Sequence, residues 1–191
     1  TLQRARGQAV GGHLHALAWG RDERSVSPHE PEKSIGNEET FEHDIDDSAE
    51  IHRRLLALSE RTASRMRAAG LTGRTLTLRV RFSDFTTITR SKTLREPTDS
   101  GRAIHEGAVA LFDALGLQRA RIRLVGVRME KLMEASASPI QGVIGEPEHG
   151  WRDADRAVDR ARSRFGSGSV RPASLIERDT PTSAGRHRDL S

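Results

Sequence analysis

Cysteine and tyrosine are both absent from the 191 residues, and aromatic residues as a whole make up only 4% of them. Without cysteine the chain can form no disulfide, no thiolate metal site and no cysteine nucleophile, which fits a reducing, cytoplasmic location. No run approaches the roughly 20 apolar residues of a membrane span, and no signal peptide is visible, so we expect no membrane contact.

The usual groupings of catalytic side chains are missing as well. The sequence shows no paired carboxylates, no nucleophile triad and no glycine-rich phosphate loop, so we expect neither catalytic residues nor a cofactor in these residues. The acids of HDIDD, His43 to Asp47, stand where a helix should begin, a position that capping and the helix dipole favour over a metal site. His13 and His15 lack the i, i+4 spacing of a zinc site.

Charge is unevenly distributed along the chain. The net charge is +4 and the isoelectric point is about 10.5, with acids dominating from Asp22 to Glu60 and bases from Arg74 to Lys131. Such segregation is what a polyanion-binding surface requires. A solvated, arginine-rich surface without a ligand explains the composition alone equally well.

Six segments can be separated along the chain. Apolar content is 35% and mean hydropathy is −0.61, so one domain with a core should be accompanied by linker or tail. The chain opens on Thr1 within a helix-like pattern, and we expect it to be a piece of a longer protein. The predicted segments are a helical 1–20 broken at Gly11 and Gly12, a linker 21–32, a folded domain 33–132, a linker 133–150, a helical extension 151–176 and a disordered tail 177–191.

Within the folded domain the hydrophobic pattern predicts a β-α-β-β-α-β order. A strand over KSIGNEETFEHD is followed by a helix that starts at an Asp47/Glu50 capping box and ends at Gly70. Two strands then flank a tight turn at Ser83-Asp84, and a helix runs from Gly101 to Leu115. The last strand, RARIRLVGVRMEKL, should be interrupted at its glycine. The fold class is therefore α+β, a four-stranded antiparallel sheet with two helices on one face.

The two faces of this sheet should differ in chemistry. The first hairpin strand alternates Leu76, Leu78, Val80 and Phe82 with threonine and arginine, so helices should cover the aliphatic side. The other side is then open, and its guanidiniums and hydroxyls suit a nucleic-acid backbone held without sequence readout. RNA-recognition motifs place aromatics on such a face for base stacking, and none is found here.

Three stretches carry a resemblance to a known family. EKSIGNEETF, GRTLTLRVRFSDFTTITRSKTL and IRLVGVRMEKL resemble the C-terminal little-finger domain of Y-family translesion DNA polymerases, of the DinB or DNA polymerase IV group. GGHLHALAWGRDERSV is similar to the end of that family's thumb and its linker. The resemblance covers about residues 1–132.

The resemblance implies that the sheet grips duplex DNA, the template–primer, during lesion bypass. It also implies a catalytic palm ahead of Thr1 that uses magnesium, so this piece should bind DNA as a monomer but not polymerise it. The sliding clamp is an open alternative as a partner, because PIQGVIGEP offers Gln141, Val143 and Ile144 without the aromatic anchor of a clamp-binding peptide.

The candidate DNA-binding residues come from two sources. The resemblance points to residues of KSIG and TRSK and to the nearby Thr87. The charge argument adds Arg79, Arg81 and Arg123. The full set is Ser34, Gly36, Arg79, Arg81, Thr87, Thr89, Arg90, Ser91, Lys92 and Arg123. Trp151, Ala154, Val158, Ala161 and Phe165 fall on one face of the predicted C-terminal helix, which could dock on the domain or on a partner. Two rival functions stay open: a catalytically inactive Y-family adaptor that recruits replication proteins, and a ferredoxin-like RNA-binding module.

Overall fold

The chain divides into two compact units, Thr1–Pro31 and Glu32–Ser191. A computed structural model describes residues 7–22, 24–25, 32–117, 119–137 and 150–176. In the first unit, helix α2 (Gln8–Ala18) runs without a break through Gly11 and Gly12. The predicted interruption is therefore wrong, because glycine weakens a helix by about 0.5–1 kcal/mol but removes none of its backbone hydrogen bonds.

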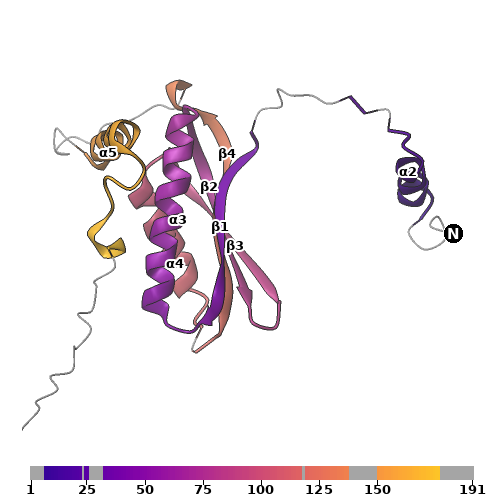
Figure 1. The fold of residues 1–191 in the computed structure, drawn as a ribbon, viewed down its shortest axis with the longest axis horizontal. Helices are drawn as coiled ribbons and strands as arrows, with labels where there is room; N and C mark the ends of the chain where they lie inside the picture. Colours follow the sequence, from indigo (N-terminus) through magenta and orange to yellow (C-terminus); the bar gives the residue numbers. More distant parts are fainter. Residues whose placement is uncertain (1–6, 23, 26–31, 118, 138–149, 177–191) are drawn as a thin grey trace, which may run out of the picture. The chain divides into compact units, whose positions relative to one another are not determined.

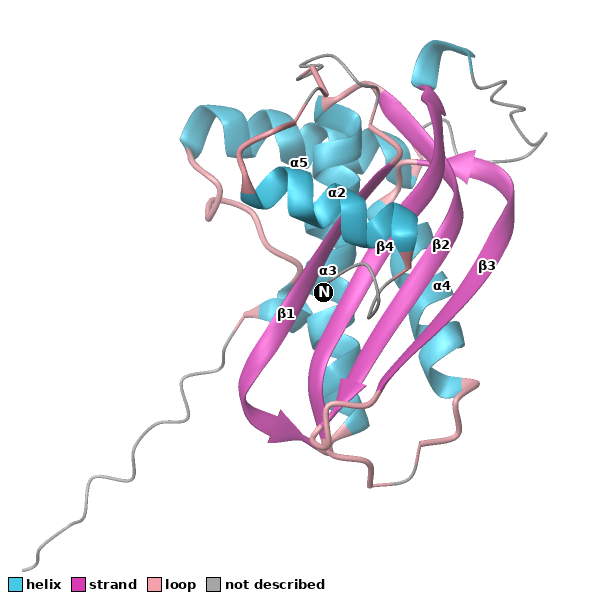
Figure 2. Cartoon of the chain, turned by 90° about the vertical axis from the view of Figure 1, so that its right-hand side faces the viewer, coloured by secondary structure: helices cyan, strands magenta, loops and turns pink. Residues whose placement is uncertain are grey.

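The second unit contains a four-stranded sheet in the order β1-β4-β2-β3, with every neighbouring pair antiparallel (Figure 2). The strands are β1 (Ser34–Ile45), β2 (Leu71–Phe82), β3 (Thr87–Thr98) and β4 (Ile122–Glu134), and a short 3-10 turn, η1 (Ala135–Ala137), follows β4. Helices α3 (Ser48–Ala68) and α4 (Gly101–Asp113) both cover one face of the sheet (Figure 1). The predicted α+β class and β-α-β-β-α-β order are confirmed.

Local chemistry explains where several of these elements begin and end. Asp47 caps α3, since its side chain accepts a hydrogen bond from the backbone N–H of Ala49 at 2.9 Å. Glu50 does not close the predicted capping box; its carboxylate binds Arg53 and Arg54 instead.

The turn between β2 and β3 is longer than predicted. It spans residues 83–86, with the Asp84 carboxylate accepting from the backbone N–H of Thr86 at 2.9 Å and Phe85 at a positive φ of 66°. β3 therefore starts at Thr87 rather than at Phe85. The predicted interruption of β4 at Gly126 is also wrong, because Gly126 pairs with Glu38 on one side and with Arg79 on the other.

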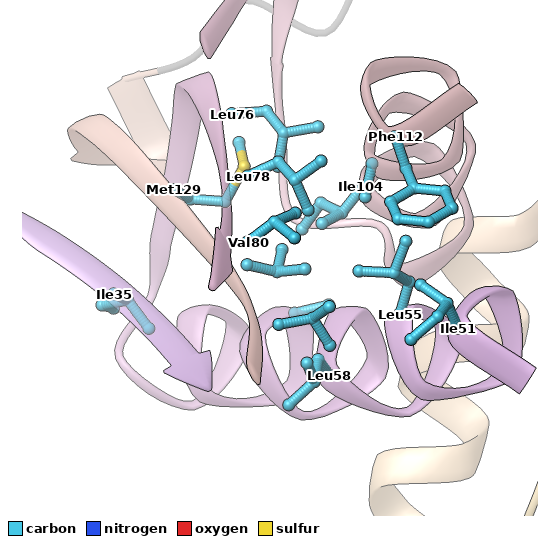
Figure 3. Packing of buried hydrophobic residues seen from close by; sticks show 14 of the residues in the cluster. Ile35, Ile51, Leu55, Leu58, Leu76, Leu78, Val80, Ile104, Phe112 and Met129 are labelled. Carbon is cyan, nitrogen blue, oxygen red and sulfur yellow. The ribbon is translucent and has the colours of Figure 1, made fainter. Parts of the chain in front are cut away.

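The core lies between the sheet and the two helices (Figure 3). Leu76 and Leu78 of β2 pair directly with Met129 and Val127 of β4, and all four side chains are at most 1% exposed. The helices contribute the buried side chains Ile51, Leu55, Leu58, Ile104 and Phe112. The aliphatic side of β2 thus faces the helices, as its alternation predicts.

Helix α5 (Trp151–Phe165) docks on α3 and α4 through charged groups rather than through its apolar side. Asp155 is its one buried residue within the described chain, whereas Trp151 and Phe165 are 62% and 70% exposed. Asp155 accepts a hydrogen bond from the backbone N–H of Gly101, at the start of α4, at 3.2 Å. Asp159 binds the Arg67 guanidinium at 2.5 Å and the Ser64 hydroxyl at 3.0 Å.

The Arg67 side chain, 7% exposed, is the centre of this contact. It also donates to the backbone carbonyl of Asp99 at 2.8 Å. Burial raises the pKa of the Asp159 carboxyl, but the hydrogen bond and charge of Arg67 outweigh it, so that pKa lies below its usual value. The contact therefore stabilises the docked helix above the ordinary aspartate pKa and weakens as pH falls through the lowered value.

We expect Arg67→Ala to release α5, because removing one partner of a buried ion pair leaves the other charges uncompensated, at a cost of about 3 kcal/mol. Amide hydrogen exchange should show loss of protection in α5 while β4 amides stay protected. Arg156→Ala is the matched control, since Arg156 is an exposed arginine of α5 itself, 4.0 Å from Asp153. Unchanged α5 protection in the Arg67 variant would contradict ionic docking.

Candidate nucleic-acid interface

The strand register arranges the side chains opposite the helices in four rows that cross the whole sheet. Residues that pair across antiparallel strands point to the same face, so the rows follow from the pairing. In the order β1-β4-β2-β3 they are Ser34–Glu130–Thr75–Thr93, Gly36–Arg128–Thr77–Ser91, Glu38–Gly126–Arg79–Thr89 and Thr40–Leu124–Arg81–Thr87. We call these sixteen residues the open face.

Most of the residues singled out in the sequence fall on this face. The register brings together seven of them from three strands: Ser34, Gly36, Arg79, Arg81, Thr87, Thr89 and Ser91. Five of these line one shallow concavity of about 570 Å³, to which β4 adds Gly126 and Arg128. The contact roles of the predicted residues remain predictions, but their proximity is a property of the fold.

Arg90 and Lys92 do not lie on the open face. Arg90 pairs with Leu78 and Lys92 with Leu76, so both side chains leave the sheet on the helix side. They remain exposed because β3 is an edge strand. The register therefore divides TRSK between the two faces, since neighbouring residues of a strand point to opposite faces, and the DNA-contact roles of Arg90 and Lys92 stay predictions.

Arg123 stands outside the four rows, at the end of the open face. The β2–β4 register shifts next to it, between Arg81 and Phe82. Its guanidinium lies 4.9 Å from the centre of the exposed Phe85 ring, a cation–π distance, and 3.8 Å from the Asp44 carboxylate. Asp44, from the acidic HDIDD stretch, is also 3.5 Å from Arg121, so it serves an ion-pair cluster.

Arg128 and Thr77, in the centre of the face, are missing from the predicted set. Arg128 pairs with Gly36 on one side and with Thr77 on the other, and its side chain is 51% exposed. The signal was present in the sequence, because Val125, Val127 and Met129 alternate with it in β4. The assumed break at Gly126 concealed that alternation.

Carboxylates accompany the arginines of the open face. Arg79 is 3.2 Å from Glu38, and Arg128 is 3.9 Å from Glu130. Glu38 belongs to the acidic part of the sequence, and it reaches the basic part because β1 pairs with β4. The charge segregation seen along the chain is therefore not a segregation in space.

The hydroxyl groups of the face are ordered by one another. Thr77 and Ser91 hydroxyls are 2.8 Å apart, and Arg81 Nε donates to the Thr87 hydroxyl at 3.0 Å. Thr75 and Thr77 are each only 8% exposed, so the middle of the face is low and the guanidiniums stand above it. Such a surface can bind anionic oxygens by charge-assisted hydrogen bonds.

Within the described parts of the chain, no group of three or more His, Asp or Glu side chains is placed to hold a metal ion. The helices among these residues are also too short or too polar to cross a membrane.

Gly36 has a steric reason to be glycine. A Cβ at this position would lie 2.8 Å from the Val127 carbonyl oxygen and 2.9 Å from the Arg128 Cβ, closer than packed atoms tolerate.

We expect Gly36→Ala to destabilise the domain by about 1–3 kcal/mol through overpacking, measured by urea unfolding. Gly150→Ala, where a Cβ would meet nothing within 4 Å, is the control and should change stability far less. Equal stability of both variants would contradict this close strand contact.

Comparison with known proteins agrees with the resemblance carried by the strand motifs. Residues 32–142 match the impB/mucB/samB family C-terminal domain. The chain is 37% identical over 165 residues to a DNA polymerase IV of Desulfatibacillum aliphaticivorans, covering 85% of this chain and 42% of that protein. It is 41% identical over 133 residues to a DNA polymerase IV of Streptomyces coelicolor, covering 70% of this chain and 28% of that one.

A DNA polymerase IV of Caulobacter vibrioides is 32% identical over 160 residues, which cover 84% of this chain and 39% of that protein. The chain thus spans less than half the length of each of these relatives and matches their family in its C-terminal domain. It belongs to the impB/mucB/samB family, in the DinB group of Y-family polymerases, and carries the little-finger domain of that group.

Proposed function

We propose that the open face grips the phosphate backbone of a template–primer duplex without reading its sequence. The observation that carries this proposal is the register, which gathers Arg79, Arg81 and Arg128 with a field of threonine and serine hydroxyls on one uncovered side of the sheet. Guanidiniums bind non-bridging phosphate oxygens, and short hydroxyls allow the backbone to approach closely.

The composition of the open face favours duplex DNA over single-stranded RNA. None of its sixteen residues is aromatic, whereas readers of single strands stack bases on aromatic side chains. The exposed Phe85 lies in the turn beyond the rows, beside Arg123. An RNA-binding module is therefore the less favoured function, and a competition between duplex DNA and single-stranded RNA separates the two.

For the whole protein we propose error-prone, template-directed DNA synthesis past lesions, in which this piece positions the duplex and performs no chemistry itself. The name that the relatives carry, DNA polymerase IV, supports this proposal. We propose further that the protein acts in the cytoplasm and as a monomer. Magnesium would serve nucleotidyl transfer elsewhere in that protein. The acids of HDIDD do not fit it, since Asp44 pairs with Arg121 and Arg123 and Asp47 caps the start of α3.

An adaptor without catalytic activity is the second candidate for the whole protein, and the acidic metal ligands of a palm domain would decide between the two. Sliding-clamp binding is a further open proposal. Gln141, Val143 and Ile144, on which it depends, lie outside the described residues.

The DNA proposal predicts a strong salt dependence. The logarithm of duplex affinity should fall linearly with the logarithm of salt concentration, and Arg79→Gln with Arg128→Gln should reduce that slope by about 1.8, or about 0.9 per phosphate contact. Fluorescence anisotropy with two unrelated duplex sequences measures this, and the loss should be equal on both.

Arg102→Gln with Arg156→Gln is the matched control, because it removes the same charge from exposed helical positions outside the open face. If the control lost as much of the salt-dependence slope, the effect would come from the net charge of the protein and not from the open face. Arg90→Gln with Lys92→Gln tests the other side of β3, and a larger loss there than at Arg79 and Arg128 would overturn the assignment of the open face.

Glu38→Gln should strengthen duplex binding. Glu38 now holds the Arg79 guanidinium at 3.2 Å, and its charge opposes an incoming phosphate. Exposed ion pairs contribute about 0.2–1 kcal/mol, so removing this competition should improve affinity by a factor of about 1.4 to 5 at low salt. The gain should disappear in the Arg79→Gln background, measured by the same anisotropy titration. A weaker-binding Glu38→Gln protein would show that Glu38 positions Arg79 productively.

A further inference from the structure

A second positively charged surface lies on the helical side of the domain and borders the open-face concavity at Asn37 and Arg65. It is a groove of about 1320 Å³ between α3 and the segment after α5, which includes the 3-10 turn η2 (Ala173–Leu175). Figure 1 shows this segment beside α3, on the side of the helices that faces away from the sheet. α3 forms one wall of the groove, and residues 171–176 form the other.

Arginine is the main charged residue of the lining: four lie on α3, one on α5 and one on the opposite wall. The lining contains six arginines, Arg53, Arg54, Arg61, Arg65, Arg162 and Arg171, against two carboxylates, Glu50 and Glu60. Glu50 is already occupied by hydrogen bonds from Arg53 and Arg54. The groove therefore holds a surplus of positive charge that its own acids do not match.

The guanidiniums that remain have few or no acidic partners. Among the residues that the structure describes, Arg61 on α3 and Arg171 on the opposite wall make no hydrogen bond or ion pair. Arg65 donates to the backbone carbonyl of Gly36 at 2.9 Å, and Arg162 to that of Val170 at 3.1 Å. Like charges that face one another across a groove favour an anion between them.

The shape and the apolar part of the lining indicate what kind of anion fits. The volume exceeds the roughly 300–1,000 Å³ of a typical small-molecule site, so a chain segment suits it better than a single small anion. Pro172, Leu175 and Ile176 add aliphatic surface, and Ile176 is 60% exposed. No aromatic side chain is among the lining residues, so the stacking platform that single-stranded nucleic acid uses is missing.

We propose that this arginine groove binds an acidic peptide segment of a partner protein, in which carboxylates alternate with aliphatic residues. The carboxylates would take bidentate hydrogen bonds from Arg61 and Arg171, and the aliphatic side chains would pack on Leu175 and Ile176. The groove meets the open-face concavity at Asn37 and Arg65, which line both, whereas Arg61 and Arg171 line the groove and not the concavity. The proposal does not depend on the DNA-binding function.

The test is fluorescence anisotropy of a labelled peptide of about ten residues, with Glu and Asp alternating with Leu and Ile, titrated with the full 191-residue chain. Arg61→Gln with Arg171→Gln should weaken binding about tenfold or more, as expected when desolvated guanidinium–carboxylate contacts are removed. Arg156→Gln with Arg160→Gln removes the same charge from exposed positions of α5 outside the groove, and its affinity should stay within about twofold of the parent. The negative probe is an uncharged peptide of equal length, in which Gln and Asn replace Glu and Asp.

Two further measurements separate this site from its alternatives. In NMR titrations the peptide should shift the amides of residues 57–65 and 171–176 and leave β3 unchanged, and duplex affinity should be the same in the groove variant as in the parent. Equal loss in both double variants would overturn the proposal. So would a labelled single-stranded oligonucleotide that binds the parent more tightly than the peptide and is weakened by the groove variant.

Discussion

The central position of β4 determines which side chains this domain presents. β4 hydrogen bonds to β1 on one edge and to β2 on the other, so its register sets both faces at once. Val127 falls opposite Leu78 under the helices, and Arg128 falls opposite Thr77 on the open side. A slip of one residue would bury the arginine and expose the valine, because side chains alternate between faces with a period of two. The aliphatic packing therefore enforces the cationic surface.

The same pairing also brings opposite charges together. β1 carries acids and β4 carries bases, and their adjacency places Glu38 beside Arg79 and Asp44 beside Arg121 and Arg123. A phosphate must compete with these carboxylates, which lowers the affinity gained per contact. For the proposed grip on a duplex, many weak and exchangeable contacts would allow sliding better than a few strong ones.

The sequence predicted an element correctly where its apolar pattern showed which side chains are buried. The alternation of Leu76, Leu78 and Val80 identified β2 and its buried side, and the helix start at Asp47 followed from local capping chemistry. In β3 the polar run TRSK does not reveal which side chains face the helices, whereas the apolar residues that flank it do. Ile88 and Leu94, both packed against the core, are separated by six positions, and that even spacing already placed Arg90 and Lys92 on the helix side.

The position of α5 could not be obtained in this way. Its apolar residues suggested an apolar contact, whereas Asp155 and Asp159 make the contact, with partners on α3 and α4 that lie far away in sequence. Ionic and hydrogen-bonded docking is directional, so it fixes the helix and the segment after it at a defined place without collapsing them onto α3. Charged groups, rather than hydrocarbon, hold α5 to the domain, and the segment that follows α5 forms the second wall of the groove.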